Sequence, residues 1–238
     1  VVPGARLAFP RDHGAHPDFR TEWWYLTGWL EGPEGPLGFQ VTFFRTRTGL
    51  GEGNPSRFAP RQVLFAHAAL SDPKVGRLLH GQRIARQGFG LAEASGRDMD
   101  IVLDGWGLAR QPSGVLHARA DGEGFGLDLA LTPTQPILLQ GEGGYSRKGR
   151  RPGQASWYYS LPHLRVAGVL EREGRRRSVR GRAWLDREWS STLLDPAAVG
   201  WDWTGINLDD GGALTAFRVR DAAGRTLWTG GGPGRSIR

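Results

Sequence analysis

The stretch EWWYLTGWL at residues 22–30, followed by EGPEGP at 31–36 and LGFQVTFFR at 37–45, determines the expected fold. Side chains alternate between the two faces of a β-strand, so Glu22, Trp24 and Leu26 share one face of the first segment. The second segment alternates in the same way, and the glycine- and proline-rich stretch between them is typical of a turn. We therefore predict an antiparallel hairpin.

The same period of two recurs along the whole chain. Glycine, at 37 of the 238 positions, separates short alternating segments and argues against long helices. We expect further strands at 63–70, 99–103, 115–120, 125–131, 156–160, 163–170, 178–189, 200–208, 213–220 and 225–228. The pattern predicts an all-β, antiparallel meander.

A domain boundary is expected within LTPTQPILLQGEGGYSRKGRRPGQAS, residues 131–156, where prolines and a glycine-rich basic loop interrupt the strands. We place an N-terminal domain at 1–135 and a C-terminal domain at 136–238. About six strands follow before GGGPGRSIR at 230–238, which has no strand character. That number is small for a closed barrel, so we expect the second domain to be incomplete, either truncated or completed by a partner.

Composition excludes several classes of function. The net charge of +7 comes almost wholly from arginine. Because no nucleic-acid-recognition motif accompanies it, we attribute this excess of arginine to codon usage rather than to nucleic-acid binding. The absence of cysteine excludes disulfides and thiolate chemistry. No apolar run approaches the roughly 20 residues of a membrane helix. The first residues do not resemble an export signal, so an exported protein would be represented here in its mature form.

The stretch AWLDREW at 183–189 carries the clearest chemical signal. In a strand, Trp184, Asp186 and Glu188 share a face, with the two carboxylates roughly 6–7 Å apart. A neighbouring charge and an adjacent indole would raise the pKa of a carboxyl group, and one that is protonated near neutral pH is a general acid. The alternative, a surface pair neutralised by nearby arginines, is equally open at this point.

Two further candidates lie in the first half of the chain. Glu22 beside Trp24 is a second carboxylate–aromatic pair, and a buried structural glutamate bonded to an arginine is an equal alternative. His67, within VLFAHAALSD at 63–72, either faces a polar cavity or satisfies a hydrogen bond in the core. Whether Glu22 and Asp186 face one cavity matters, because two separate cavities would weaken an enzymatic interpretation.

Other catalytic machinery is missing from the sequence. His13 and His16 are spaced by three, but without a downstream partner they are a weak metal motif, and we predict no metal. Neither a G-x-S-x-G elbow nor a phosphate-binding glycine loop occurs in the required setting. Any catalysis is therefore expected to be acid–base chemistry by carboxylates or histidine, without a cofactor.

Two of these motifs resemble those of a known protein family. E-W-W-Y-x-T-G at 22–28 and W-x-D-x-E-W at 184–189, with the segments between them in the same order, resemble the AttH/CrtC-like family over residues 8–230. That family includes predicted secreted hydrolases and, more distantly, carotenoid 1,2-hydratases. The resemblance implies two consecutive lipocalin-like antiparallel β-barrels, the second incomplete in this chain.

The resemblance also implies roles for individual residues. In the hydratase branch an aspartate of a Tyr-x-Asp motif donates the proton, and by motif it corresponds to Asp186, with Trp184 in place of the tyrosine. An upstream pair falls near Trp157 and Tyr159, without the histidine of that branch, which puts carotenoid hydration itself in doubt. We predict catalytic roles for Asp186, Glu188, Glu22 and His67, and substrate contacts for Trp24, Trp157, Tyr159, Trp184 and Trp203.

Two functions follow from these residues. The first is a hydrolase or hydratase that uses cofactor-free acid–base chemistry on a small lipophilic or polyene-like molecule, with Asp186 as the acid. The second is a non-catalytic, lipocalin-like carrier of an apolar ligand. We expect a secreted or periplasmic protein that does not bind nucleic acid and has no transmembrane segment. Association with a membrane surface is compatible with this expectation.

Overall fold

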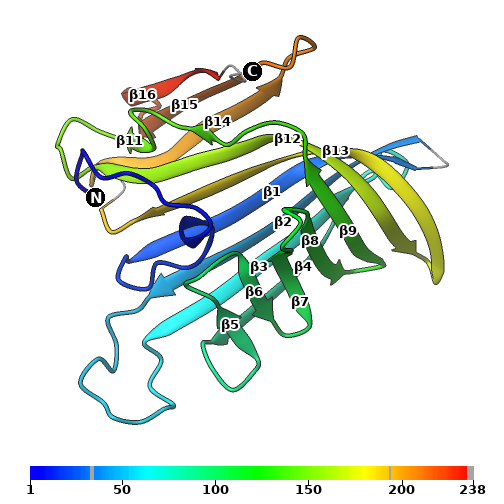
Figure 1. Ribbon diagram of the computed structural model, residues 1–238, viewed down its shortest axis with the longest axis horizontal. Helices are drawn as coiled ribbons and strands as arrows, with labels where there is room; N and C mark the ends of the chain where they lie inside the picture. Colours follow the sequence, from blue (N-terminus) through cyan, green and yellow to red (C-terminus); the bar gives the residue numbers. More distant parts are fainter. Residues whose placement is uncertain (33–34, 193, 235–238) are drawn as a thin grey trace.

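The computed structural model describes residues 1–32, 35–192 and 194–234, and the fold is all-β and antiparallel, as predicted (Figure 1). The predicted hairpin is confirmed, because β1 (Thr21–Gly32) pairs with β2 (Gly35–Arg47) along its whole length. Residues 33 and 34, part of the predicted turn, lie outside the described residues. The helical content of the described chain is one 3-10 turn, η1 (Arg11–His13).

The main sheet has the strand order β4-β3-β2-β1-β13-β12-β9-β8-β7-β6-β5, and β10 and β11 pair with β12. The remaining bounds are β3 (Gln62–Ser71), β4 (Leu78–Arg86), β5 (Ala92–Ala94), β6 (Asp100–Leu103), β7 (Trp106–Arg110), β8 (Leu116–Gly122), β9 (Phe125–Pro133), β10 (Leu138–Leu139), β11 (Tyr145–Arg147), β12 (Ala155–Arg172) and β13 (Arg175–Ser190). Sequence periodicity missed β4, β5, β7, β10 and β11, which are short or rich in polar residues.

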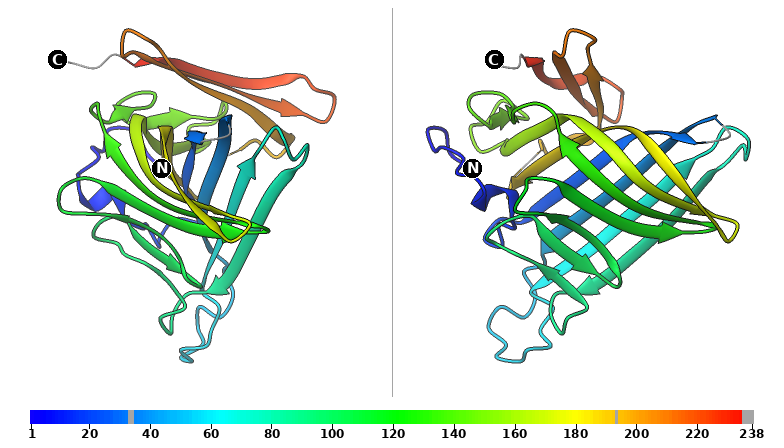
Figure 2. Two further views of the ribbon diagram at one scale, coloured as in Figure 1. Left: turned by 90° about the vertical axis from the view of Figure 1, so that its right-hand side faces the viewer. Right: turned by 45° about the vertical axis from the view of Figure 1, so that its right-hand side comes forward.

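The eleven strands of the main path curl into a nearly closed barrel (Figure 2). The amide N–H of Glu123, in the β8–β9 turn, donates to the carbonyl of His80 in β4 at 3.2 Å. A side chain at Gly81 would place its Cβ 2.5 Å from the carbonyl oxygen of Asp121, so glycine is required for this approach. Backbone contact between β4 and β8 therefore draws the barrel together.

The long strands β12 and β13 belong to the barrel although they follow residue 136. The segments predicted separately at 156–160 and 163–170 form the single strand β12, with an irregularity between Leu161 and Leu164 that accommodates Pro162. Strand β13 pairs with both β1 and β12. The predicted boundary at 135/136 thus falls within one hydrogen-bonded sheet, and the division into two domains stays a prediction.

The last strands form a separate three-stranded sheet, β14 (Ala198–Asn207), β15 (Ala213–Asp221) and β16 (Thr226–Gly234). It lies outside the barrel, across β12 and β13, and is orange to red in Figure 2. In place of a second barrel, the described residues therefore provide this small sheet. The expectation that 230–238 lacks strand character is wrong for 230–234, which belong to β16, and 235–238 lie outside the described residues.

The barrel core is filled from the inner face of its strands. Leucine, alanine and aromatic side chains from β1 to β9, β12 and β13 pack into one cluster, which includes Trp24, Leu26 and Leu185. Alternation in β1 and β13 thus gives each of these strands a core face and an outer face that the small sheet overlies. No helix in the described ranges is long and apolar enough to cross a bilayer.

Candidate functional site

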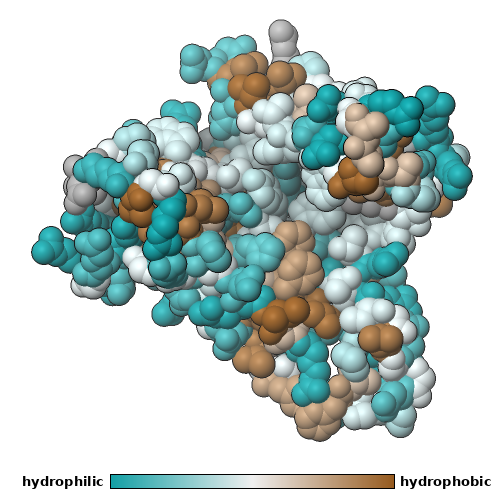
Figure 3. Space-filling view, turned by 180° about the vertical axis from the view of Figure 1, so that it is seen from behind, coloured by the Kyte–Doolittle hydropathy of each residue, from teal (hydrophilic) through white to brown (hydrophobic). Residues whose placement is uncertain are grey.

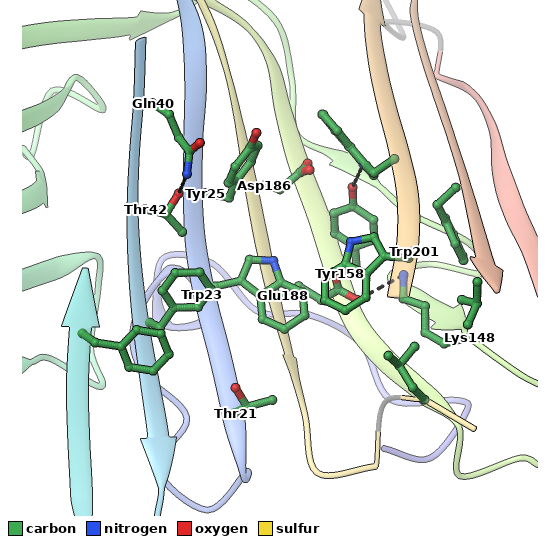
Figure 4. Close-up of a pocket in the computed structure, with 16 residues that line it drawn as sticks. Thr21, Trp23, Tyr25, Gln40, Thr42, Lys148, Tyr158, Asp186, Glu188 and Trp201 are labelled. Carbon is green, nitrogen blue, oxygen red and sulfur yellow. Dashed lines mark hydrogen bonds and ion pairs between the residues drawn. The ribbon is translucent and has the colours of Figure 1, made fainter. Parts of the chain in front are cut away.

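A pocket of about 590 Å³ lies on the outer face of the barrel, between β1, β2, β12 and β13 on one side and the small sheet on the other (Figure 4). Its barrel wall comes from alternate residues of adjacent strands. Its lining residues are Thr21, Trp23, Tyr25, Gln40, Thr42, Phe44, Phe65, Lys148, Tyr158, Asp186, Glu188, Leu194, Trp201, Trp203, Phe217 and Val219. The predicted pair Asp186 and Glu188 does share a face, and this face lines the pocket.

Asp186 is buried and accepts hydrogen bonds at Oδ1. The Ser160 hydroxyl donates at 2.5 Å, and the indole N–H of Trp184 donates at 2.6 Å. Burial raises the pKa of Asp186 from 3.8 to about 7, the hydrogen bonds from Ser160, Trp184 and Tyr158 oppose this rise, and the charge of Glu188 adds to it. At neutral pH this carboxyl group is poised between its acid and base forms.

A chain of hydrogen bonds fixes the Asp186 carboxyl group from the small sheet. The Thr215 hydroxyl donates to Gln140 Oε1 at 2.8 Å, and Gln140 Nε2 donates to Ser160 Oγ at 2.9 Å. The Ser160 hydroxyl in turn donates to Asp186. These buried side chains connect β15 through the β10 region to β12 and β13. The small sheet therefore both covers the pocket and orients its acid.

Glu188 has a different environment from Asp186, although it lies only two residues away. Its Oε1 accepts a hydrogen bond from Ser156 and forms an ion pair with Lys148 Nζ at 3.0 Å. The Lys148 ammonium group also lies 4.1 Å from the centre of the Phe217 ring and 4.6 Å from that of Tyr158. Glu188 is therefore held by a cation and a hydroxyl group, whereas the hydrogen-bond donors of Asp186 are neutral side chains. The two carboxyl groups thus differ in the charge of their partners.

The pocket walls are aromatic. Trp23 of β1 stacks on Trp201 of the small sheet, with ring centres 6.5 Å apart and planes 13° apart. Tyr25 meets Trp203 edge to face at 5.8 Å, and the Trp203 indole N–H donates to the Tyr158 hydroxyl at 3.1 Å. Burial raises the pKa of Tyr158 well above its usual value, so this phenol stays neutral. The site is thus a largely aromatic pocket with two acids in its wall.

Glu22 does not share this pocket. It lies on the inner face of β1, where its carboxylate forms ion pairs with Arg45 and Arg187 and accepts the amide N–H of His16 at 3.0 Å. Burial favours a high pKa for Glu22, but Arg187, His16 and Arg45 outweigh it and lower the pKa to about 2. The structural alternative weighed for Glu22 therefore describes its environment. Asp186 faces the opposite side of the sheet, so the two acids do not share a cavity, and this separation weakens the enzymatic interpretation as far as it includes Glu22.

Several predicted substrate contacts lie with Glu22 inside the barrel. Trp24 donates its indole N–H to the His13 carbonyl at 2.9 Å, and Tyr159 meets His13 Nδ1 at 2.7 Å. Trp157 belongs to the same buried cluster. Burial, with the nearby charge of Arg110, lowers the pKa of His13 to about 4, so its ring is neutral. These residues close the barrel mouth beneath the N-terminal segment, separated from the pocket by the sheet.

The other predicted residues lie at or near the pocket. Trp203 lines it, and Trp184 packs edge to face on Trp203 at 6.0 Å while bonding to Asp186. His67 is exposed on the outer face of β3, beside the rings of Phe44 and Phe65 at 5.7 and 6.1 Å. Strands β1 and β2 lie between His67 and Asp186 in the sheet. The catalytic and binding roles assigned to all these residues stay predictions.

The sequence prediction overlooked Tyr158, Ser160, Lys148 and Gln140. Two of them follow from alternation, because Tyr158 and Ser160 pair with Glu188 and Asp186 across β12 and β13. Choosing Trp157 and Tyr159 instead selected the opposite face of that strand. Lys148 and Gln140 lie in loops or short strands, for which periodicity carries no signal. Among the residues that the structure describes, no group of three or more potential metal ligands was found.

Comparison with known proteins agrees with the sequence motifs. The AttH-like family matches residues 1–233. A protein from Nitrosomonas europaea described as an AttH is 52% identical, with a TM-score of 0.90, and the match covers 98% of this chain and 71% of that one. Kievitone hydratase from Nectria haematococca is similar in fold at 12% identity and a TM-score of 0.66, over 95% of this chain and 64% of that one. No curated protein sequence matches significantly. The chain therefore belongs to the AttH-like family.

Proposed function

We propose that this chain is a hydratase- or hydrolase-like enzyme that performs cofactor-free acid–base chemistry on a lipophilic substrate in the outer pocket. The observation that carries the proposal is Asp186, a buried carboxyl group with its pKa raised to about 7 at the wall of an aromatic pocket. Glu188, held by Lys148, supplies the complementary base. The finer expectation that the small sheet belongs to a second lipocalin-like barrel is part of the same proposal.

A hydration fits these groups step by step. Asp186 transfers its carboxyl proton to one carbon of a carbon–carbon double bond, and the other carbon becomes a cation. The faces of Trp23, Trp201 and Tyr25 stabilise this cation, because aromatic rings are negative on their faces. Water adds to the cation and gives up a proton to a carboxylate of the pair, which restores the starting charge. The sum is one water added, without any redox change.

The apolar wall indicates the nature of the substrate. Trp23, Phe44 and Phe65 pair across β1, β2 and β3 and form one row on the outer face. Neighbouring strands lie about 4.8 Å apart, so this row offers roughly 10 Å of aromatic surface leading away from the acid. A small molecule with an extended apolar part is therefore the best fit. The fold similarity to kievitone hydratase is compatible with the proposed class of reaction and carries no information about the substrate.

The test is native mass spectrometry of freshly purified protein, which detects co-purified lipid or polyene and any conversion of it. Wild-type protein should carry a ligand together with the same ligand plus one water. Asp186→Asn should carry only the unmodified ligand, while Asp128→Asn, at an exposed acid on β9, should behave as wild type. Equal amounts of the hydrated ligand in Asp186→Asn and wild type would rule out Asp186 as the acid.

The carrier alternative is supported by one observation, the aromatic enclosure itself. Stacked Trp23 and Trp201 close over the pocket and would hold an apolar ligand whether or not it reacts. In this case the same experiment gives a different result. Wild-type protein and Asp186→Asn would both retain one unmodified ligand, and no product would accumulate on incubation.

A further inference from the structure

We propose that one end of the barrel docks on an anionic lipid surface through an aromatic tip. We define the aromatic tip as Phe58 and Phe89 with the arginines Arg57 and Arg86. Phe58 lies in the loop between β2 and β3, and Phe89 lies in the turn between β4 and β5. The two rings stack with centres 4.8 Å apart, yet Phe58 is 60% exposed and Phe89 is 51% exposed.

The arginines at the aromatic tip give it its charge. The Arg86 guanidinium lies 4.7 Å from the centre of the Phe58 ring and 5.2 Å from that of Phe89, and Arg57 lies 5.5 Å from that of Phe89. The one acid of the β2–β3 loop, Glu52, is paired with Arg47 at 2.6 Å. Guanidinium groups framing exposed aromatic rings complement a surface of phosphate headgroups above acyl chains.

The backbone holds Phe89 outward in an unusual conformation. Its φ of 63° lies in the left-handed region, which a bulky side chain rarely adopts. A bridge between Gly88 and Ala92 closes the turn around it. Arg86, the last residue of β4, donates to the carbonyl of Phe58 on the neighbouring loop at 3.1 Å. The aromatic tip is therefore a built feature that keeps apolar rings in contact with solvent.

The aromatic tip is connected to the pocket by an apolar path. Ile84, which is 75% exposed, pairs with Phe65 and extends the row of Phe44 and Trp23 onto β4. Arg86 of the aromatic tip is the next residue on the same face of β4. Figure 3 shows apolar residues running down this side of the molecule to its lower end. A lipid surface at the aromatic tip would thus adjoin the path by which an apolar ligand reaches Asp186.

Vesicle binding tests the proposal without knowledge of the substrate. We expect the protein to sediment with vesicles of phosphatidylcholine containing about 30 mol % phosphatidylglycerol, and to do so more weakly with phosphatidylcholine alone or in about 0.5 M NaCl. The double variant Phe58→Ser/Phe89→Ser should lower the partition coefficient at least about tenfold. Trp29→Ser, at an exposed tryptophan near the other end of β1, should leave it unchanged.

Fluorescence gives an independent reading of orientation, because the chain contains no cysteine of its own. A Cβ at Gly53, in the β2–β3 loop, meets nothing within 4 Å, so Gly53→Cys accepts a polarity-sensitive dye. Anionic vesicles should raise its emission, whereas a dye on Ser178→Cys, at the other end of the barrel, should not respond. The proposal is overturned if wild type does not bind vesicles, if the double variant binds equally, or if size-exclusion shows that the two phenylalanines instead mediate a dimer.

Discussion

Asp186 and Glu22 lie on opposite faces of neighbouring strands, and burial has opposite outcomes for them. Asp186 receives hydrogen bonds from neutral donors, so the cost of burial dominates and its pKa rises to about 7. Glu22 is held between two guanidinium groups, so its pKa falls to about 2. The sequence supports a carboxylate next to an indole in both places. It cannot tell which carboxylate meets arginine, because that depends on which residues pair across the sheet.

The pH dependence of activity follows from the protonated form of Asp186. Catalysis by a general acid with a pKa of about 7 should decline above pH 7, by roughly tenfold for each pH unit. The charge of Glu188 raises this pKa, so Glu188→Gln should move the decline to lower pH. Steady-state rates on a co-purified ligand between about pH 5 and pH 9 provide the check. A rate that increases through this range would contradict the role of acid.

The contributions of Asp186 and Glu22 to the stability of the fold should change with pH in opposite directions. Because the folded-state pKa of Asp186 is raised, its ionisation destabilises the fold progressively between about pH 4 and pH 7. Asp186→Asn should therefore be more stable than wild type at pH 8, by up to about 4 kcal/mol, and similar to it near pH 4. Urea unfolding at the two pH values measures this. A loss of stability at pH 8 would mean that the carboxylate itself supports the fold.

Glu22→Gln should have the reverse effect. It leaves Arg45 and Arg187 buried without a counter-charge, which costs about 3–5 kcal/mol of unfolding free energy at neutral pH. The folded-state pKa is lowered, so the stability that Glu22 contributes is present above its usual pKa of 4.5 and is lost as the pH falls towards 2. The difference in unfolding free energy between the variant and wild type should become smaller over that pH interval. Equal unfolding free energies at pH 7 would contradict the ion-pair network of Glu22, Arg45 and Arg187.

At the scale of elements, the seam between β1 and β13 positions both sites. Gly181 is required there, because an added Cβ would overlap the backbone of Trp29 in β1. We expect Gly181→Ala to cost about 1–3 kcal/mol by forcing the strands apart. Gly38→Ala, where the nearest atom to the new Cβ is 3.4 Å away, is the matched control. Thermal unfolding of both variants is the measurement, and equal melting temperatures would show that the seam is not tightly packed.

Most strands were predictable because one face of each is buried and period two is then imposed by packing. The β1–β2 hairpin and the faces of β13 were correct on these grounds. The joining of two predicted segments into the single strand β12 could not be predicted. Proline is normally excluded from a central strand, and Pro162 is tolerated here at an irregularity. The sequence also could not distinguish Tyr158 from Tyr159. These neighbours point to opposite faces of β12, so Tyr158 lines the pocket and Tyr159 lies in the barrel core.

At the scale of the whole molecule, the pocket exists because a small sheet overlies the outer face of a filled barrel. This arrangement is not encoded in the alternation of any one strand. Trp201 and Trp203 contribute a wall only because β14 lies against β1 and β13. Sequence reasoning placed Asp186 and Glu188 on one strand face, which lines the pocket, but it could not locate the cavity outside the barrel, and their catalytic roles stay predictions.

Ligand binding should be visible in the small sheet. Strand β14 exposes many of its side chains, and the small sheet to which it belongs has only three strands, so its amides should exchange with solvent faster than those of β1 and β13. A bound apolar ligand should slow exchange in β14 and β15 and leave β6 to β8 unchanged. Hydrogen–deuterium exchange with and without the co-purified ligand measures this. Protection confined to the barrel interior would place the ligand elsewhere.

The most direct test of the central claim is a measurement of the Asp186 pKa in the free protein. Carbon-13 NMR of the aspartate carboxyl groups, with Asp186→Asn to assign the resonance, follows its titration without any substrate. We predict a midpoint near pH 7, because the carboxyl group is buried beside Glu188 and its donors are neutral. A midpoint near the ordinary value of 3.8 would show a solvated carboxylate and would contradict its role as the acid of the pocket.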